Sequence, residues 1–159
     1  MEKRILQDAQ DFRLKCYRRM LLIDGAEDYA IQDYQEDWRD AQKKVKTLFA
    51  YLDSHDVTPE EEGELLLTIF VGLQIGFRNS ELMERATDRA FELLPQLPQG
   101  KLLCHLLVFL YDETEDEAML EDIDHLFSSF PRPLTQEDRY LQETYRNTID
   151  SIPYRMLAV

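Results

Sequence analysis

The stretch from residue 58 to residue 77 decides the fold of this chain, and it reads TPEEEGELLLTIFVGLQIGF. Thr58 is a preferred N-cap residue, Pro59 suits the first position of a helix, and Glu61 can close a capping box with the threonine. The run of three glutamates also favours the positive end of a helix dipole. The sequence therefore predicts a helix that begins at Thr58 and Pro59.

The rest of this helix, from Leu65 to Phe77, is apolar on almost every side. Only Thr68, Gln74 and two glycines, Gly72 and Gly76, interrupt the apolar run. A helix that is hydrophobic all round is normally covered by other elements. We expect it to be central in the fold, and the two glycines, one turn apart, to let a neighbouring helix approach closely.

Two further helices are predicted upstream. In the first, apolar residues recur every three or four positions from Ile5 to Ile23, and Gly25 is a suitable C-cap. In the second, steps of three and four alternate along Ile31, Tyr34, Trp38, Ala41, Val45, Leu48 and Leu52. Such a seam usually faces a core, but its heptad regularity leaves homodimerisation open.

Four helices are predicted downstream. One opens at Asn79 and Ser80 and stops at Pro95, and the next runs from Leu102 to Tyr111. The sixth is expected to turn Ala118, Ile123, Leu126, Phe127 and Phe130 inward. The last helix has a capped start at Thr135 and is expected to end at Pro153, with Leu141, Tyr145, Thr148 and Ile152 on its inner stripe.

No segment alternates with the period of a strand, so we expect an all-α fold of about seven helices in consecutive antiparallel hairpins. Residues 1–159 should form a single domain, with 1–57 as an N-terminal helix pair and 58–152 as the helical core. The segment Leu93–Pro98 echoes Leu126–Pro131 at close to the period of tetratricopeptide repeats. A tetratricopeptide-like arrangement of the C-terminal part, serving as a scaffold for other proteins, therefore remains an alternative.

Composition limits the kinds of partner. The net charge is −14, from 18 basic and 32 acidic residues, which disfavours direct contact with nucleic acid or anionic membranes. Cys16 and Cys104 lie in apolar helical patterns and form no metal-binding pair, as expected of free buried thiols in a reducing compartment. No apolar run is long enough to span a membrane. We expect a soluble, cytoplasmic protein.

Acidic residues concentrate between residues 112 and 124, which hold eight acids and no base. This cluster consists of Asp112, Glu113, Glu115, Asp116, Glu117, Glu121, Asp122 and Asp124. One interpretation is a solvated face that also complements a helix dipole. The other is a docking surface for a basic protein, and these eight residues are the candidate partner-binding site.

Evidence for catalysis is poor. Asp122 and His125 share a helical face, but a di-iron site in a helical bundle needs a second such pair and further carboxylates. Cys104 and His105 are adjacent, which points them about 100° apart on a helix. No phosphate-binding loop or nucleophile elbow occurs. We expect no enzyme, no metal and no cofactor.

The order of features from Thr58 onward resembles a known family. The segments that carry the resemblance are Thr58–Glu62, Glu84–Leu94, Leu97–Leu107, the acid-rich turn and Pro133–Asp138. Together they resemble the UpxZ family of transcription antitermination antagonists, found in Bacteroides capsular polysaccharide loci. The similarity runs over about residues 58–145, and residues 1–57 share only a helical character.

The resemblance implies a regulatory role. UpxZ proteins are paired with UpxY proteins, NusG-like antiterminators that let RNA polymerase read through the leader of a capsule locus. Each UpxZ interferes with the UpxY proteins of other loci, so the implied partner is a NusG-like antiterminator. The resemblance supplies no functional residues for this chain.

Overall fold

The computed structural model describes residues 3–23, 31–75 and 79–157, and the side chains of residues 3–19, 35–75 and 79–150. Every regular element in this part of the chain is helical, which confirms the all-α fold. The chain forms two compact units, residues 1–97 and residues 98–159. That they make up a single domain, divided at residues 57 and 58 as the sequence suggested, stays a prediction.

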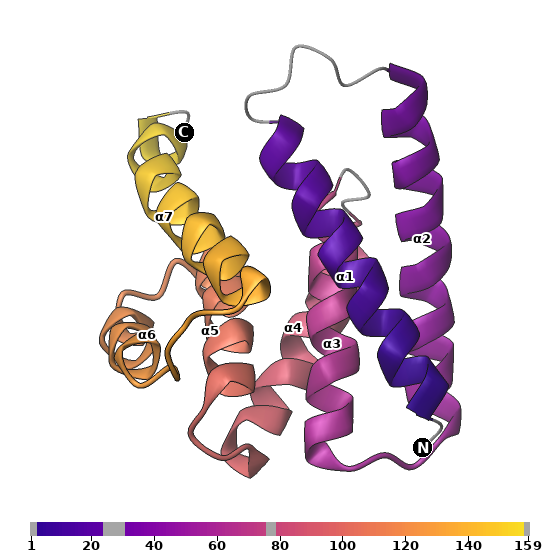
Figure 1. Ribbon diagram of the computed structural model, residues 1–159, viewed down its shortest axis with the longest axis horizontal. Coiled ribbons are helices and arrows are strands. Elements are labelled where there is room, and N and C mark those ends of the chain that lie inside the picture. Colours follow the sequence, from indigo (N-terminus) through magenta and orange to yellow (C-terminus); the bar gives the residue numbers. More distant parts are fainter. Residues whose placement is uncertain (1–2, 24–30, 76–78, 158–159) are drawn as a thin grey trace. The chain divides into compact units, whose positions relative to one another are not determined.

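The first unit contains α1 (Lys3–Ile23), α2 (Ile31–Ser54), α3 (Pro59–Gln74), α4 (Ser80–Leu93) and the 3-10 turn η1 (Leu94–Gln96). Helix α3 contacts α1, α2 and α4, and the chain reverses direction from α1 to α2 and again to α3 (Figure 1). The side chains of α3 from Gly63 to Leu73 are buried except that of Glu64. The expectation of a central apolar helix is therefore confirmed.

The start of α3 forms as its sequence predicts. Thr58 accepts a hydrogen bond from the Glu61 amide at 3.2 Å, and the Glu61 carboxylate accepts one from the Thr58 amide at 2.9 Å. Of these two bonds, the one from the Thr58 amide stabilises the carboxylate and lowers the pKa of Glu61. Each satisfies a backbone group that a helix start would otherwise leave without an intrahelical partner.

Close packing of α2 on α3 depends on Gly72. A Cβ atom at this position would lie 2.8 Å from Cγ2 of Val45 and 3.6 Å from the ring of Phe12. Real Cβ atoms essentially never show a contact of 2.8 Å, whereas 3.6 Å is an ordinary van der Waals contact, so a side chain at residue 72 would force Val45 of α2 to shift. The expected close approach is confirmed at Gly72, whereas Gly76 and the predicted cap at Gly25 lie outside the described residues.

The seam of α2 is part of this core. Ala41, Val45, Leu48 and Leu52 are fully buried within the chain, and Trp38 is half-buried. These four side chains therefore do not face a second copy of the protein. Ile31 and Tyr34, the first two residues of the seam, lie outside the described side chains.

Polar contacts also connect α1 to the core. Arg13 is 3% exposed and contacts the carboxylate of Glu64 at 3.1 Å and the hydroxyl of Thr68 at 3.3 Å. Thr68 in turn donates a hydrogen bond to the carbonyl of Ala9 at 3.1 Å. Burying a charge without partners is energetically costly, but the Arg13 guanidinium is partnered by the Glu64 carboxylate and the Thr68 hydroxyl.

The second unit contains α5 (Lys101–Thr114), α6 (Ala118–Ser128) and α7 (Gln136–Leu157). Helix α5 contacts both α6 and α7, and its residues from Leu103 to Tyr111 are buried. The predicted capped start of α7 is confirmed, because Thr135 and Asp138 exchange hydrogen bonds of 2.9 and 3.1 Å. Ile123, Leu126, Phe130, Leu141, Tyr145 and Thr148 are buried as expected.

Two details of the predicted helices were wrong. Helix α7 continues through Pro153 to Leu157, because the φ of proline is fixed near the helical value and the helix can accept the loss of one backbone hydrogen bond. Ala118 is exposed and does not face the core, since it is the first residue of α6. No helix among the described residues has the length and apolarity that crossing a membrane requires.

The sequence echo does not extend to the helices around it. Leu93 and Leu97 are buried near the end of α4, and Leu126 and Phe130 are buried at the matching positions near the end of α6. However, the starts of α4 and α6 are further apart in sequence than the starts of α5 and α7. The echo marks two similar helix ends, and whether it reflects a repeat stays a prediction.

Candidate protein-docking site

The eight predicted acidic residues fall on three successive parts of the second unit. Asp112 and Glu113 lie half-buried in the last turn of α5. Glu115, Asp116 and Glu117 form the exposed link to α6. The exposed residues of α6 itself are Glu121, Asp122 and Asp124. Six of the eight are thus accessible to a partner along one link and one helix.

The link has a structural role of its own. Glu115 ends α5 in the left-handed conformation, with a φ of 54°, and its amide donates to the carbonyl of Tyr111 at 2.8 Å. Asp116 then accepts a hydrogen bond from the amide of Ala118, the first residue of α6, at 3.0 Å. Asp116 therefore contributes to the turn, whatever it contributes to binding.

Asp124 connects the acidic cluster to an apolar groove between α6 and α7. The groove has a volume of about 380 Å³. It is lined by Asp124 and Phe127 from α6 and by Gln142, Tyr145, Arg146, Ile149 and Asp150 from α7. Asp124 was predicted from the sequence as a partner-binding residue. The groove could not be predicted in the same way, because it forms only where α6 and α7 pack together.

Aromatic rings form one wall of the groove. The rings of Phe127 and Tyr145 have centroids 5.7 Å apart, and the Tyr145 hydroxyl donates to Oδ1 of Asp124 at 3.4 Å. Burial and the charge of Asp124 raise the pKa of Tyr145 well above its usual range. Tyr145 is therefore a neutral donor that holds the Asp124 carboxylate at the edge of the groove.

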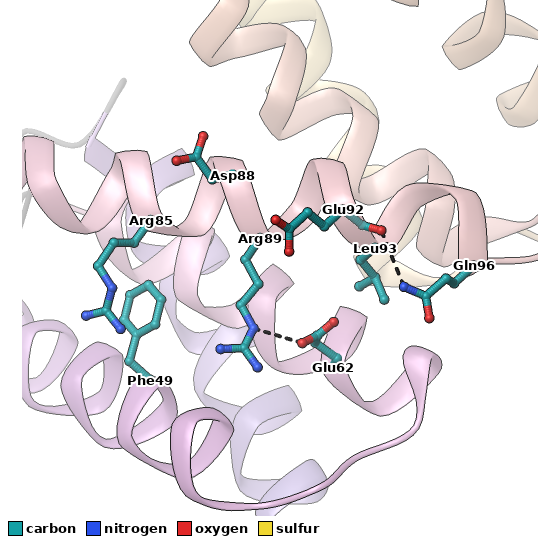
Figure 2. Close-up of a pocket in the computed structure, with 8 residues that line it drawn as sticks. All are labelled: Phe49, Glu62, Arg85, Asp88, Arg89, Glu92, Leu93 and Gln96. Carbon is teal, nitrogen blue, oxygen red and sulfur yellow. Dashed lines mark hydrogen bonds and ion pairs between the residues drawn. The ribbon is translucent and has the colours of Figure 1, made fainter.

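A second pocket, in the first unit, is built around Arg85 and Arg89 (Figure 2). Both arginines extend from α4 toward α2 and α3, into a hollow of about 500 Å³. The guanidinium of Arg85 lies 4.6 Å from the ring centroid of Phe49. No sequence motif marks these two residues, although they are the two bases of an otherwise acidic helix and are spaced one turn apart.

Both guanidinium groups of this pocket already form ion pairs with carboxylates. Nε of Arg89 lies 2.8 Å from Oε1 of Glu62, and its Nη1 lies 3.2 Å from Oδ1 of Asp53. Arg85 Nη2 contacts the other oxygen of Asp53 at 3.0 Å. The network joins α4 to the end of α2 and the start of α3, so its evident role is to hold these helices together.

The three histidines lie in different segments of the chain: His55 follows α2, His105 is in α5 and His125 is in α6. His55 stacks on Tyr51 with ring centroids 4.0 Å apart, and His105 is buried with its Nδ1 3.9 Å from Oε1 of Glu137. His125 is exposed on α6, as is Asp122. Within residues 3–23, 31–75 and 79–157, no group of three or more His, Cys, Asp or Glu side chains is arranged to hold a metal ion.

The described structure is an all-helical protein with an exposed acidic surface, and comparison with known proteins identifies its family. Residues 13–112 match the model of the UpxZ family of transcription anti-terminator antagonists, and the chain belongs to this family. The family's role is regulatory and not catalytic. A comparison with curated protein sequences gave no match.

A solved structure has the same fold. It is the crystal structure of a transcription anti-terminator antagonist UpxZ from Bacteroides uniformis, which matches with a TM-score of 0.73 and 22% identity. The match covers 94% of this chain and 96% of that chain.

The family match also changes the extent of the resemblance. It begins at Arg13, so it includes the second half of α1 and all of α2, which at the level of sequence resemble the family only in being helical. It ends at Asp112, the first residue of the acidic cluster. The other seven acidic residues, and the groove beside them, therefore lie beyond the segment that matches the family model.

Proposed function

We propose that this protein acts in the cytoplasm by binding and inhibiting NusG-like antiterminators of the UpxY type that belong to other capsular polysaccharide loci. Membership of a family of anti-terminator antagonists supports the regulatory part of this proposal. We place the partner-binding surface on the link between α5 and α6 and on α6 itself, because the acidic side chains there are exposed.

The charge of this surface suits such a partner. A factor that works beside RNA polymerase and nucleic acid must itself tolerate strongly negative surroundings, and basic patches are the usual means. Acidic side chains from Glu115 to Asp124 would attract such a patch and compete with nucleic acid for it. Attraction of this kind acts mainly on the rate of association.

The direct test is co-purification of the full chain with a panel of NusG-like factors, followed by binding kinetics. In one variant Asp116, Glu117, Glu121 and Asp122 are changed together to Asn or Gln. Asn at residue 116 keeps an oxygen that can accept the hydrogen bond from the amide of Ala118. We expect a slower association and a shallower dependence on salt, because the Debye length is only about 8 Å at physiological ionic strength.

A matched control removes the same number of charges elsewhere. Asp8, Glu36, Asp56 and Glu84 are exposed acids of the first unit, two of each type, and lie outside the acidic cluster. Their neutralisation makes the net charge less negative by the same amount but should leave the association rate near that of the wild type. If both variants bound equally fast, general charge and not the cluster would steer the partner.

A further inference from the structure

The groove between α6 and α7 has an unusual apolar residue at its edge. Ile149 is 41% exposed, and it shares the groove with the faces of Phe127 and Tyr145. Among the described side chains, the other large apolar residue with such exposure is Phe91 of α4, at 39%. A lone exposed apolar residue needs no explanation, but one that continues an aromatic wall forms a contiguous apolar surface.

Negative charge borders this apolar surface on both sides. Asp124 lies on α6 and Asp150 on α7, and Glu121 extends the acidic edge because it is one turn before Asp124. Arg146 is the one base among the described lining residues, and its Nη1 contacts Oε2 of Glu143 at 3.2 Å. Among the described lining residues the groove therefore combines apolar side chains with two carboxylates and one arginine, and this arginine already pairs with Glu143.

We propose that this groove receives a short segment of the antiterminator in which an apolar side chain is flanked by lysine or arginine. The apolar side chain would pack on Phe127, Tyr145 and Ile149, and the basic side chains would meet Asp124 and Asp150. The identity of the partner rests on the proposed function, whereas the chemistry of the segment rests on the groove.

The division of roles follows from the geometry. Exposed carboxylates act over a distance and affect association, whereas an apolar anchor is desolvated only after docking and affects dissociation. The groove should therefore set the lifetime of the complex, and the acidic cluster beside it should set the speed of its formation.

Ile149→Ser tests the anchor, and Phe91→Ser is its matched control because the two side chains are similarly exposed. We expect Ile149→Ser to raise the dissociation rate of a bound NusG-like factor about tenfold or more, with association and its salt dependence unchanged. Phe91→Ser should change neither rate. Equal dissociation rates for wild type and Ile149→Ser would overturn the proposed anchor.

A second measurement separates the groove from the identity of the partner. The full chain is titrated with a short amphipathic peptide of leucine and lysine while the methyl signals of Ile149 are followed by NMR, and the same peptide with glutamine in place of leucine is the control. Only the leucine peptide should shift these signals. If the leucine peptide shifts these signals while no NusG-like factor binds the protein, the proposed function is wrong but the proposed binding of apolar side chains in the groove is supported.

The remaining outcomes are also decisive. If neither peptide shifts the Ile149 signals, the groove has no affinity for apolar side chains and the inference fails, even where a NusG-like factor binds elsewhere. Sedimentation of the wild type and Ile149→Ser tests the competing occupant. A dimer that this substitution splits into monomers would mean that a second copy covers the groove, and would overturn the inference.

Discussion

Asp138 and Lys101 join the first turn of α7 to the first residue of α5, with 2.7 Å between Oδ2 and Nζ. The Asp138 side chain is 2% exposed and also accepts a hydrogen bond from the Thr135 amide. Burial opposes its ionisation, but the hydrogen bonds from Lys101 and Thr135 outweigh burial and lower the pKa of Asp138. One carboxylate therefore both caps a helix and pairs with a cation.

We expect Asp138→Asn to lower the free energy of unfolding at neutral pH by about 1–3 kcal/mol, because Lys101 loses its buried charged partner. Since the pKa is lower in the folded state, the stabilisation is complete above the unfolded-state value of about 4 and is lost as the pH falls through the folded-state value. Urea unfolding of both proteins from neutral to acidic pH should show the difference shrink toward acid. A constant difference, or an equal loss in the exposed-site control Asp56→Asn, would contradict this role.

Gly72→Ala should destabilise the first unit by about 1–3 kcal/mol, even though alanine favours helix. The new methyl group would meet Val45, a buried and stiff β-branched side chain, at 2.8 Å. Gly100→Ala is the control, because no atom lies within 4 Å of a Cβ there. Thermal unfolding of the two variants measures the difference, and an unchanged midpoint for Gly72→Ala would mean that α2 can move aside.

Both thiols should be unreactive in the native protein. Burial, followed by the nearby charges of Asp37 and Asp124 respectively, raises the pKa of Cys16 and of Cys104 from 9.0 to about 12. Below pH 9 this leaves about a thousandfold less thiolate than an ordinary cysteine has. A chromogenic thiol reagent should label neither residue quickly at pH 8 and both quickly in denaturant. Fast labelling of Cys104→Ala in the native state would show that Cys16 is accessible.

Thr58→Ala should cost about 1 kcal/mol of stability, because the amide of Glu61 loses its capping oxygen. Thr58→Ser keeps the hydroxyl and should restore most of this stability. Chemical denaturation of the two variants distinguishes a capping role from a role of the threonine methyl group, since only the latter would make the serine variant as unstable as the alanine variant.

Much of the fold is visible in the sequence because its signals are local. The start of α3 depends on four consecutive residues, and the burial of α3 follows from the absence of a polar face between Leu65 and Leu73. The end of α7 could not be predicted in the same way. Pro153 is a reliable stop only when tertiary packing does not favour a longer helix, and the sequence does not report that packing.

The site was only half predictable for a related reason. Six acids of the cluster are exposed, as their composition suggested. The groove beside them is formed by residues of both α6 and α7, and no short sequence motif predicts contacts between residues so far apart in the chain. The Arg89 network was missed for the same reason, because its partners Asp53 and Glu62 are 36 and 27 positions away in the sequence.

The central place of α3 has a consequence for how the first unit opens. Because α3 contacts α1, α2 and α4, exposing its backbone to solvent requires all three neighbours to separate from it. Its amide hydrogens should therefore exchange with deuterium only when residues 1–97 unfold as a whole, whereas amides at the outer helix ends exchange through local fraying. The exchange rate of the α3 amides would then report the global stability of this unit.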